Sequence, residues 1–444
     1  MAWYLYILQC GDGSLYTGIT DDVQRRLAAH RAGKGAKYTR GRGPLELIYV
    51  EEQADKPAAL RREIAIKQMP RQKKLELVKQ GVNYHKKGEE NMKVSQIETP
   101  ALIVERSVFE NNMAVMSRLL EQTTMAFRPH YKSHKSFDVV KRQLAAGAKG
   151  ITCAKLSEAE DLAQAGVSDI LIANQVVQPE KLGRVAVLAN KTRLTICVDH
   201  DQQVEALERA MAVQGGTLYV LVEYEIGMNR CGVETHEEVI HLARLISEQP
   251  HLCFEGIQAY AGQLSHEVDF EVRSSASAAI EADLTQLKNK LEEAGLAPKE
   301  ISGGSTGTVE LKPGDSVYTE MQCGSYLFMD GAYAQLDLRF ENSLFLLTTV
   351  ISTKPDRIVT DGGMKSLGMD QGNPIFVGYE GLPVSMSEEH GQVAAPGHSA
   401  RMGDKLRYIP GHCCTTINMH DKLYLVDGED VVDIWTVTSR GKSV

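Results

Sequence analysis

The chain has 444 residues, of which 43% are hydrophobic and 24% charged, and this is more than one hydrophobic core usually organises. It contains no run of 18 or more apolar residues, and its first residues lack the basic lead and cleavage site of a secretory signal. We therefore expect two or three domains in a cytoplasmic protein without a membrane span. Eight cysteines scattered through apolar stretches argue against a disulfide framework.

Charge divides the chain into a basic front and an acidic remainder. Residues 1–90 contain 17 Lys and Arg against 11 Asp and Glu, a net charge of +6, and the other 354 residues contain 32 against 47, a net charge of −15. A small basic domain suits a polyanion such as nucleic acid. The same charges also fit an ordinary solvated surface, and composition alone does not decide between the two.

The front of the chain predicts a small α+β domain. Two strand-like runs, residues 4–8 and 15–19, are joined by a Gly-Asp-Gly turn and followed by helical stretches. Over residues 1–82 the sequence resembles the GIY-YIG nuclease superfamily, although the first triplet of the motif keeps only its tyrosine. The resemblance implies a site of two motif tyrosines, an arginine, a histidine and a metal-binding glutamate: Tyr6, Tyr16, Arg26, His30 and Glu63.

These residue types suit phosphodiester chemistry. Tyrosine can assist an attacking water, arginine neutralises developing phosphate charge, and a carboxylate binds a hard divalent ion. The resemblance therefore implies a structure-specific DNA endonuclease. Taken one at a time, the same residues also fit half-buried strand tyrosines and a surface charge.

After a polar stretch at 84–91, strand-like runs alternate with amphipathic helices up to about residue 312. Seven or eight such units predict a (β/α)8 barrel, and the short β-rich runs that follow predict an all-β domain. The expected domains are thus 1–83, a linker at 84–91, the barrel at 92–335, and a C-terminal β domain at 336–444 that packs against the barrel.

The segment RPHYKSHK, residues 128–135, follows the first barrel strand, where barrels carry catalytic groups. A lysine here can form a Schiff base if partial burial and neighbouring positive charge lower its pKa, and Arg128, His130, His134 and Lys135 are candidates to supply that charge. A basic anion-binding loop without covalent chemistry is the alternative. A glycine-rich loop after the last clear strand, GGSTGT at 303–308, can cradle a phosphate and favours the covalent interpretation.

Residues 92–444 resemble the D-threonine aldolase and D-serine dehydratase family of alanine-racemase-type pyridoxal-phosphate enzymes. The resemblance rests on RPHYKSHK, EYEIGMNRCG, GIQAYAG, GGSTGT, GSYLFMD, SEEHG and PGHCCTT. It implies that Lys132 carries pyridoxal phosphate with Lys135 in support, that Tyr326 lies on the cofactor, and that Arg230 lies near its ring. It also implies a phosphate-binding loop made of Gly304, Thr306, Gly307 and Thr308.

A metal site is expected near the C-terminus. On a strand, residues two apart point the same way, so His412 and Cys414 could hold one ion while Cys413 faces the other side. An isolated His-x-Cys is more often a packed histidine and a buried thiol, but the family resemblance implies a divalent metal here. A thiolate ligand favours zinc over manganese or magnesium.

The resemblance implies a lyase acting on D-3-hydroxy amino acids. The His-x-Cys pair favours dehydration of D-serine or 3-hydroxy-D-aspartate to a 2-oxo acid and ammonia. The alternative is a D-threonine aldolase that gives glycine and an aldehyde. An amino-acid racemase is disfavoured by the metal pair, and a regulatory barrel serving the nuclease module is disfavoured by the intact Lys132. Barrels of this family often form homodimers, although the sequence shows no interface.

Overall fold

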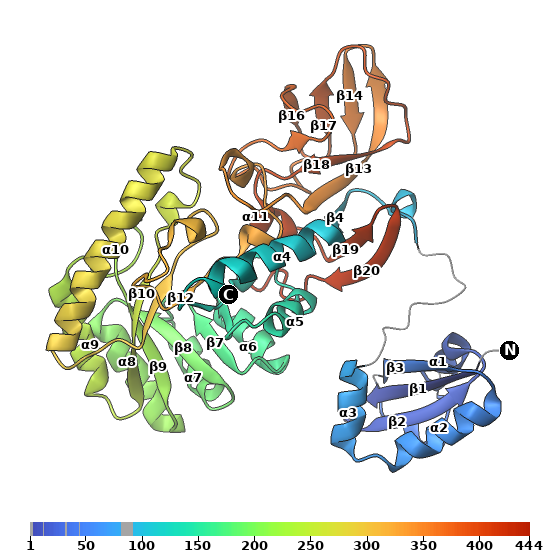
Figure 1. Cartoon of the computed structure of the whole chain (residues 1–444), viewed down its shortest axis with the longest axis horizontal. Coiled ribbons are helices and arrows are strands. Elements are labelled where there is room, and N and C mark those ends of the chain that lie inside the picture. The colour runs from blue at the N-terminus through green and yellow to red at the C-terminus, as the bar shows by residue number, and fades with distance from the viewer. Residues whose placement is uncertain (1–2, 12, 32, 44, 81–91) are drawn as a thin grey trace. The chain divides into compact units, whose positions relative to one another are not determined.

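The computed structural model describes residues 3–444 apart from 12, 32, 44 and 81–91, so the linker expected at 84–91 lies outside the described residues. The chain divides into two compact units, Met1–Glu90 and Asn91–Val444 (Figure 1). No helix among the described residues is long and apolar enough to cross a membrane.

The first unit is a three-stranded antiparallel sheet with helices on both faces. Side chains of β1 alternate between the faces, so Tyr6 and Leu8 pack with α1 while Leu5 and Ile7 pack with Ile66 of α2. This is the small α+β domain that the sequence predicts. Its elements are β1 (Trp3–Cys10), β2 (Leu15–Thr20), α1 (Val23–Arg31), η1 (Lys37–Thr39), β3 (Leu45–Gln53), α2 (Lys56–Gln68) and α3 (Arg71–Gln80).

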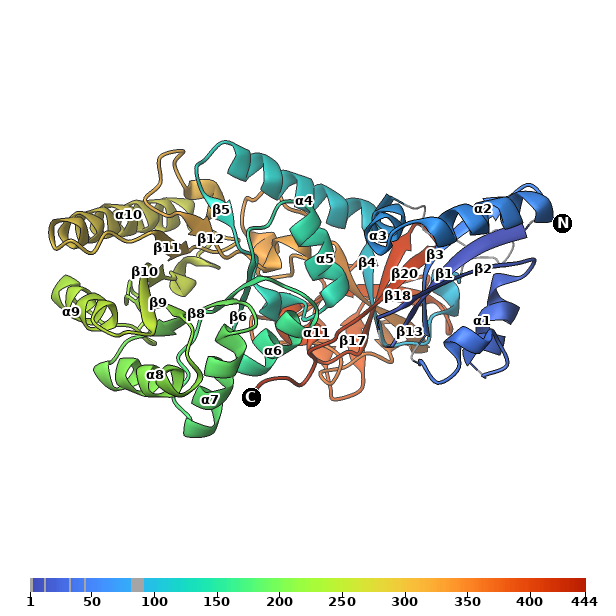
Figure 2. The same cartoon turned by 90° about the horizontal axis from the view of Figure 1, so that it is seen from below.

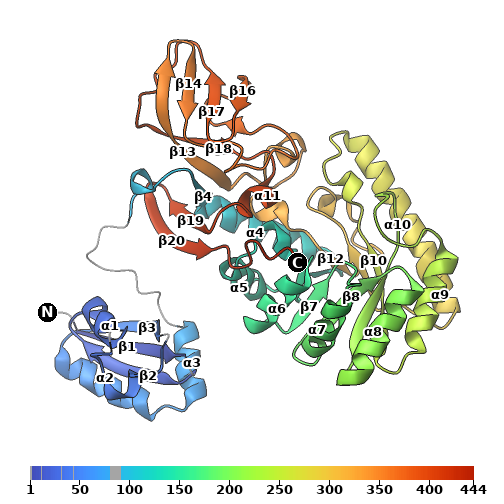
Figure 3. The ribbon, with the colours of Figure 1, turned by 180° about the vertical axis from the view of Figure 1, so that it is seen from behind.

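The second unit contains an eight-stranded parallel sheet that closes into a barrel, with its helices outside the strands (Figure 3). A parallel bridge between His130 and Thr152 joins the first strand to the second and closes the ring. The strands are β5 (Ala126–Phe127), β6 (Ile151–Cys153), β7 (Asp169–Ile172), β8 (Arg193–Val198), β9 (Leu218–Glu223), β10 (Leu252–Ala259), β11 (Glu300–Gly303) and β12 (Glu320–Met321). The main outer helices are α5 (Phe137–Ala145), α6 (Leu156–Gln164), α7 (Pro179–Ala189), α8 (Asp201–Gln214), α9 (His236–Ser247) and α10 (Phe270–Glu293).

The predicted (β/α)8 barrel with a β domain is confirmed by this sheet and by solved relatives described below. Apolar side chains of the strands pack with apolar side chains of the outer helices, as expected for parallel strands covered by helices. The strand that sequence patterns did not resolve is β12. It is only two residues long, too short to show a period.

The β domain is a nine-stranded sheet that takes one strand from ahead of the barrel (Figure 2). Strand β4 pairs with β13 and β19, and helix α4 (Arg106–Glu121) then leads into the barrel. Phe109 of α4 lies 5.2 Å from the ring of Trp435 and so ties this connection to the sheet. The strands are β4 (Ala101–Glu105), β13 (Leu344–Lys354), β14 (Arg357–Thr360), β15 (Ile375–Phe376), β16 (Val384–Met386), β17 (Gly391–Ala394), β18 (Lys405–Ile409), β19 (Lys422–Asp427) and β20 (Asp430–Thr436).

The strand predicted through His412 and Cys414 is wrong. A short helix, α11 (Cys413–Ile417), begins there with His412 as its N-cap. The backbone of His412 makes an isolated antiparallel bridge to Gly368, and the chain then turns at once into the helix. Both residues nevertheless line one cavity, while Cys413 is fully buried.

Candidate active site

Lys132 lies on the loop after β5, in the short turn η3 (Tyr131–Ser133). Its backbone N–H donates to Nδ1 of His130 at 3.3 Å, and its ammonium lies 5.4 Å from the ring centroid of Tyr260. The side chain borders a cavity of about 590 Å³. The same cavity is lined by residues from the glycine-rich loop, from the loop after β10 and from α11: Ser305, Thr306, His266, His412 and Cys414.

The cluster of positive charge expected around Lys132 is absent among the described residues. Arg128 is 3% exposed and pairs with Asp169 at 2.7 Å and with Glu320 at 3.0 Å, so its charge is already balanced. Burial lowers the pKa of His130 well below its usual value and that of His134 to about 4, so both imidazoles are neutral near pH 7.

The two lysines of the loop have different surroundings. Lys135 has a left-handed backbone (φ 49°) and pairs with the buried carboxylate of Glu158 at 3.3 Å. Lys132 makes no ion pair within the described part of the chain. Of the two, Lys132 is therefore the amine available to a carbonyl compound in the cavity.

The glycine-rich loop presents an unpaired hydroxyl to the cavity. Oγ1 of Thr306 is buried and has no hydrogen-bond partner. Thr308 instead shapes the loop, because its Oγ1 accepts from the backbone N–H of Ser305 at 3.1 Å. Gly304 has a φ of +73°, and a Cβ on Gly307 would lie 2.1 Å from the carbonyl oxygen of Ser265. Gly307 lets the loop fold tightly against the segment after β10, and Gly304 lets it pass close to the side chain of Met321.

Arg230 lines a second cavity of about 180 Å³, which shares Lys132 with the first. Its guanidinium lies 3.8 Å from Glu223.

Tyr326, by contrast, lines neither of these two cavities. It is 1% exposed and packs edge-on against Phe127 at 5.5 Å. The placement of Tyr326 on the cofactor is therefore not retained.

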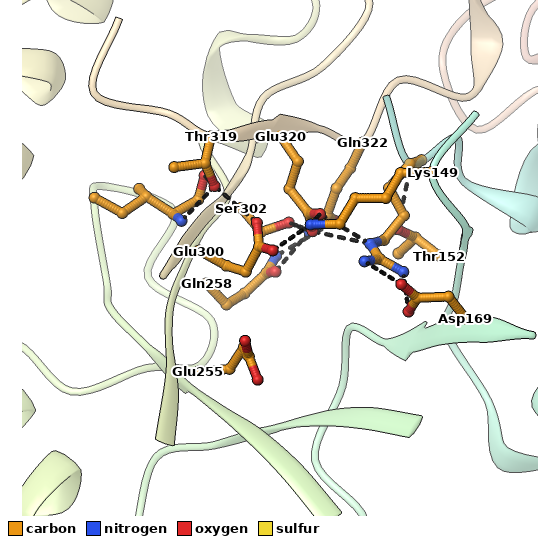
Figure 4. Close-up of polar contacts among 12 residues, drawn as sticks. Lys149, Thr152, Asp169, Glu255, Gln258, Glu300, Ser302, Thr319, Glu320 and Gln322 are labelled. Carbon is orange, nitrogen blue, oxygen red and sulfur yellow. Dashed lines mark hydrogen bonds and ion pairs between the residues drawn. The ribbon is translucent and has the colours of Figure 1, made fainter. Parts of the chain in front are cut away.

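A chain of buried hydrogen bonds inside the barrel fixes the side-chain amide of Gln322 (Figure 4). Glu320 is ion-paired with Arg128, and as a carboxylate it can only accept. Ser302 Oγ therefore donates to it at 2.6 Å and accepts from Gln322 Nε2 at 2.7 Å. The other hydrogen of that Nε2 goes to Gln258 at 2.7 Å. This network fixes the orientation of the Gln322 amide, whose Oε1 is a hydrogen-bond acceptor and lies 3.5 Å from Nε2 of Gln258. Gln322 lines both cavities.

His412 is held by a carboxylate. Its Nδ1 lies 2.6 Å from Oδ2 of Asp370, which orients the ring. Burial lowers the pKa of His412, but hydrogen bonds with Cys414 and Asp370 raise it more, to about 9. Hydrogen bonding from Cys413, together with the His412 imidazole, holds the pKa of the Cys414 thiol well below its usual value. Without a metal, the pair is therefore a thiolate beside an oriented imidazolium.

His266 is a candidate that the sequence patterns missed. Its Nε2 is buried without a hydrogen-bond partner, and its ring lies 4.4 Å from that of Tyr333 and 6.5 Å from that of His412. Burial is the main reason that the pKa of His266 is lowered. The residue sits in an ordinary polar loop after β10, so only the three-dimensional structure brings it beside the predicted metal pair.

In the first unit, four of the five predicted residues lie together. Oη of Tyr6 lies 2.9 Å from Nε2 of His30 and accepts from Nε of Arg26 at 3.2 Å. The ring of Tyr16 lies 5.1 Å from that of His30, whose Nδ1 contacts Thr39 at 2.7 Å. Burial raises the pKa of Tyr6 to about 12 and lowers that of His30.

Glu63 is the predicted residue that the structure does not join to this cluster. It lies on α2, whose Ile66 packs with Leu5 and Ile7 on the other face of the sheet. Its carboxylate pairs with Lys67 at 2.8 Å, one turn along the same helix.

Comparisons with known proteins match each part of the chain. The model of the alanine racemase N-terminal domain matches residues 104–332, a serine dehydratase domain matches 343–426, and the GIY-YIG catalytic domain matches 2–76. A D-threonine aldolase of Arthrobacter is 40% identical over 361 residues, covering 79% of this chain and 94% of the relative. The chain belongs to the D-threonine aldolase and D-serine dehydratase family.

Members of this family are pyridoxal-phosphate-dependent lyases, as the sequence predicted. The crystal structure of D-threonine aldolase from Filomicrobium marinum superposes with a TM-score of 0.78 at 35% identity, covering 80% of this chain and all of that one. A 3-hydroxy-D-aspartate aldolase of Paracoccus denitrificans is 38% identical over 79% of this chain and 94% of the relative. A D-threo-3-hydroxyaspartate dehydratase of Delftia is 28% identical over 72% and 92%.

The first unit is a GIY-YIG domain. A UPF0213 protein of Streptococcus sanguinis is 58% identical to it over 77 residues, which is 17% of this chain and 88% of the relative.

The residues of this lyase fit its cofactor. The unpaired Lys132 and the orphaned hydroxyl of Thr306 open into the same cavity, which offers an amine for the aldehyde and a donor for the phosphate. A metal fits as well, because the carboxylate-held imidazole of His412 and the thiolate of Cys414 are ligands of the kind that divalent ions take. No group of three or more His, Cys, Asp or Glu that could hold a metal ion occurs in the described residues.

Proposed function

We propose that the second unit cleaves the Cα–Cβ bond of D-3-hydroxy amino acids to give glycine and an aldehyde. The observation that carries this proposal is the unbonded Nε2 of His266, buried in the same cavity as Lys132 and beside His412. This aldol cleavage needs a base for the proton of the 3-hydroxyl. Because burial lowers the pKa of His266, its imidazole is neutral near pH 7 and can accept that proton.

Lys132 would hold pyridoxal phosphate, with Thr306 and the backbone around Gly304 and Gly307 at the phosphate and Arg230 near the ring. When bound, this cofactor supplies an electron sink for the pair released when a bond to Cα breaks. With cofactor and substrate bound, the Nζ of Lys132 would return a proton to Cα. Gln322, whose amide is fixed by Ser302, is an acceptor on the same wall.

His412 and Cys414 would hold the metal, and the thiolate favours zinc over manganese or magnesium. A metal there supplies charge stabilisation to the oxygen of the 3-hydroxyl group. Asp370 keeps the His412 ring in one orientation through Nδ1, which leaves Nε2 for the ion. The ring of Tyr333 packs against that of His266 at 4.4 Å.

Dehydration to a 2-oxo acid and ammonia is the second candidate, and Cys414 is the observation that favours it. A cysteine-to-alanine mutant of a D-threo-3-hydroxyaspartate dehydratase, 25% identical to this chain, has been solved in a metal-free form. In this reaction Lys132 would remove the α-proton and the 3-hydroxyl group would leave. The greater identity to aldolases supports the first candidate over the second.

Product analysis separates these reactions. Purified protein loaded with pyridoxal phosphate is incubated with D-threonine, D-serine and D-threo-3-hydroxyaspartate, with and without chelator. Glycine with an aldehyde supports aldol cleavage, a 2-oxo acid with ammonia supports dehydration, and the L-enantiomer indicates racemisation. Turnover that is unchanged by chelator would refute the metal assignment.

For the GIY-YIG domain we propose phosphodiester cleavage of branched DNA. The contacts of Tyr6 with Arg26 and His30 support a shared site, and the net charge of +6 over residues 1–90 suits a polyanion. Cutting of a branched duplex by wild type but not by Arg26→Ala is the expected result. Equal cutting by both proteins would remove Arg26 from the site, and no cutting by either would remove the activity.

A further inference from the structure

The excess positive charge of the GIY-YIG domain lies in one segment. Residues 23–45 contain seven Lys and Arg and no Asp or Glu, while the rest of residues 1–90 contains 10 against 11, a net charge of −1. Spread evenly, the same charge would fit an ordinary solvated surface. Concentrated in one short segment, it gives a local positive field that a polyanion can recognise.

This segment lies against the tyrosine and histidine cluster of the domain. It contains α1 and the loop with η1 that follows that helix. Oγ1 of Thr39 lies 2.7 Å from Nδ1 of His30, and a Cβ on Gly35 would clash with the His30 ring. The loop therefore packs directly on His30 and brings its charges to the edge of the candidate site.

The loop at 34–42, here called the basic loop, carries cations without acidic partners. The side chains of Lys34, Lys37 and Arg40 are exposed and make no hydrogen bond or ion pair within the described part of the chain. On α1, by contrast, Arg25 pairs with Asp21 at 2.7 Å. Uncompensated positive charge beside the cluster is thus a property of the basic loop.

An exposed aromatic ring lies among these cations. Tyr38 is 45% exposed, and its ring lies 6.0 Å from that of Tyr16 at an interplanar angle of 29°. The guanidinium carbon of Arg42 lies 4.5 Å from the centroid of the Tyr38 ring. A base that stacks on this ring would therefore carry its phosphate next to a cation, which is how proteins hold single-stranded nucleic acid.

Stacking of this kind needs a base with an open face. In a duplex each base is already stacked between its neighbours, and extruding it costs free energy. An unpaired strand presents its bases without that cost. We propose that the basic loop binds an unpaired DNA strand, with a base stacked on Tyr38 and its phosphates beside the cations of the loop. This inference rests on the proposed DNA role of the domain, but it concerns binding and not cleavage.

Fluorescence anisotropy tests the stacking. The full chain is titrated into a labelled oligothymidylate and into a duplex of the same length, in buffer without divalent ions so that the strands stay whole. Wild type should bind the single strand more tightly than the duplex. Tyr38→Ala should weaken binding of the single strand by about tenfold, whereas Tyr38→Phe, which keeps the ring, should bind it nearly as wild type does.

The salt dependence of the same titration tests the cations. Lys37→Gln should weaken binding of the single strand and make the slope of log K against log salt shallower by about 0.7, the effect of one phosphate contact on a single strand. Lys73→Gln is the matched control, because it removes the same charge from α3, whose Leu77 packs on the other face of the sheet. It should leave affinity and slope near those of wild type.

Equal affinity of wild type for single strand and duplex, or unchanged affinity in Tyr38→Ala, overturns the inference. Equal losses in Lys37→Gln and Lys73→Gln place the DNA elsewhere on the domain and overturn it as well. Tighter binding of the matching RNA strand identifies a different partner and also contradicts it. Single-strand binding without cutting of a branched duplex supports the inference and removes only the proposed cleavage, while absence of binding to any DNA removes both.

Discussion

The two sites of the chain differ in how their polar groups are satisfied. In the GIY-YIG domain, Oη of Tyr6 contacts both Nε2 of His30 and Nε of Arg26, so these polar atoms have partners within the protein. In the barrel, Thr306 Oγ1 and His266 Nε2 are buried with no partner. A buried polar atom without a partner costs about 1–3 kcal/mol, so such atoms mark places where a ligand completes the structure.

The largest effect should come from Lys132→Ala, which removes the unpaired amine of the cavity. We expect loss of the lysine-linked cofactor absorbance and a fall in kcat of at least about 10³-fold. Absorbance spectroscopy and product assay on the same sample check both.

Lys135→Ala is the control for that variant, since it removes the other lysine of the loop. Its cofactor absorbance should persist, but thermal unfolding should shift downward, because Glu158 is left as a buried unpaired charge. If the absorbance of lysine-linked cofactor persisted in Lys132→Ala and was lost in Lys135→Ala, Lys135 and not Lys132 would be the cofactor-binding lysine.

His266→Asn should lower kcat by about 10²–10⁴-fold, the usual contribution of a general base, while cofactor absorbance stays unchanged. Burial disfavours the protonated imidazole, so the acid limb of kcat/KM in wild type should lie below the usual histidine pKa of 6.5. Activity is therefore retained as pH falls to this limb and is lost below it. A pH profile with the same acid limb in His266→Asn would contradict the role of this residue.

Thr306→Val should weaken pyridoxal phosphate binding by about 10- to 100-fold, since a hydrogen bond to a charged group contributes roughly 1.5–3 kcal/mol. Equilibrium titration of the apoprotein measures this, and Thr306→Ser, which keeps the hydroxyl, should bind nearly as wild type does. If both variants bind alike, the orphaned hydroxyl is not a phosphate donor.

The smallest effect is expected from Tyr6→Phe in the GIY-YIG domain. Loss of the shared hydroxyl removes its contacts with Nε2 of His30 and Nε of Arg26, so the domain should lose about 1 kcal/mol of unfolding free energy. Calorimetry of the full chain reports this change. The lyase rate, expected to be unchanged, shows that the barrel is intact.

The sequence patterns predicted those features that depend on residues close together in the chain. Repeating strand and helix periods indicated the barrel, and the motifs around Lys132 and residues 303–308 fall in one cavity. The pairing of Lys135 with Glu158, the neutralisation of Arg128 by Glu320, and the position of His266 depend on residues far apart in sequence. The helix at Cys413 was missed because five residues are too few to show a period.

Tyr326 shows the limit of carrying a role over by resemblance. Its motif is present, yet the ring is buried against Phe127 and Phe340 rather than in the cavity with Lys132. Tyr260 and Tyr333 are the tyrosines that line the cavity instead.

The most direct test of the proposed lyase is the product balance from D-threonine with wild type and Lys132→Ala side by side. Our account predicts glycine and acetaldehyde in equal amounts from wild type, and neither from the variant. Formation of 2-oxobutanoate and ammonia without glycine, or equal glycine from both proteins, would contradict it.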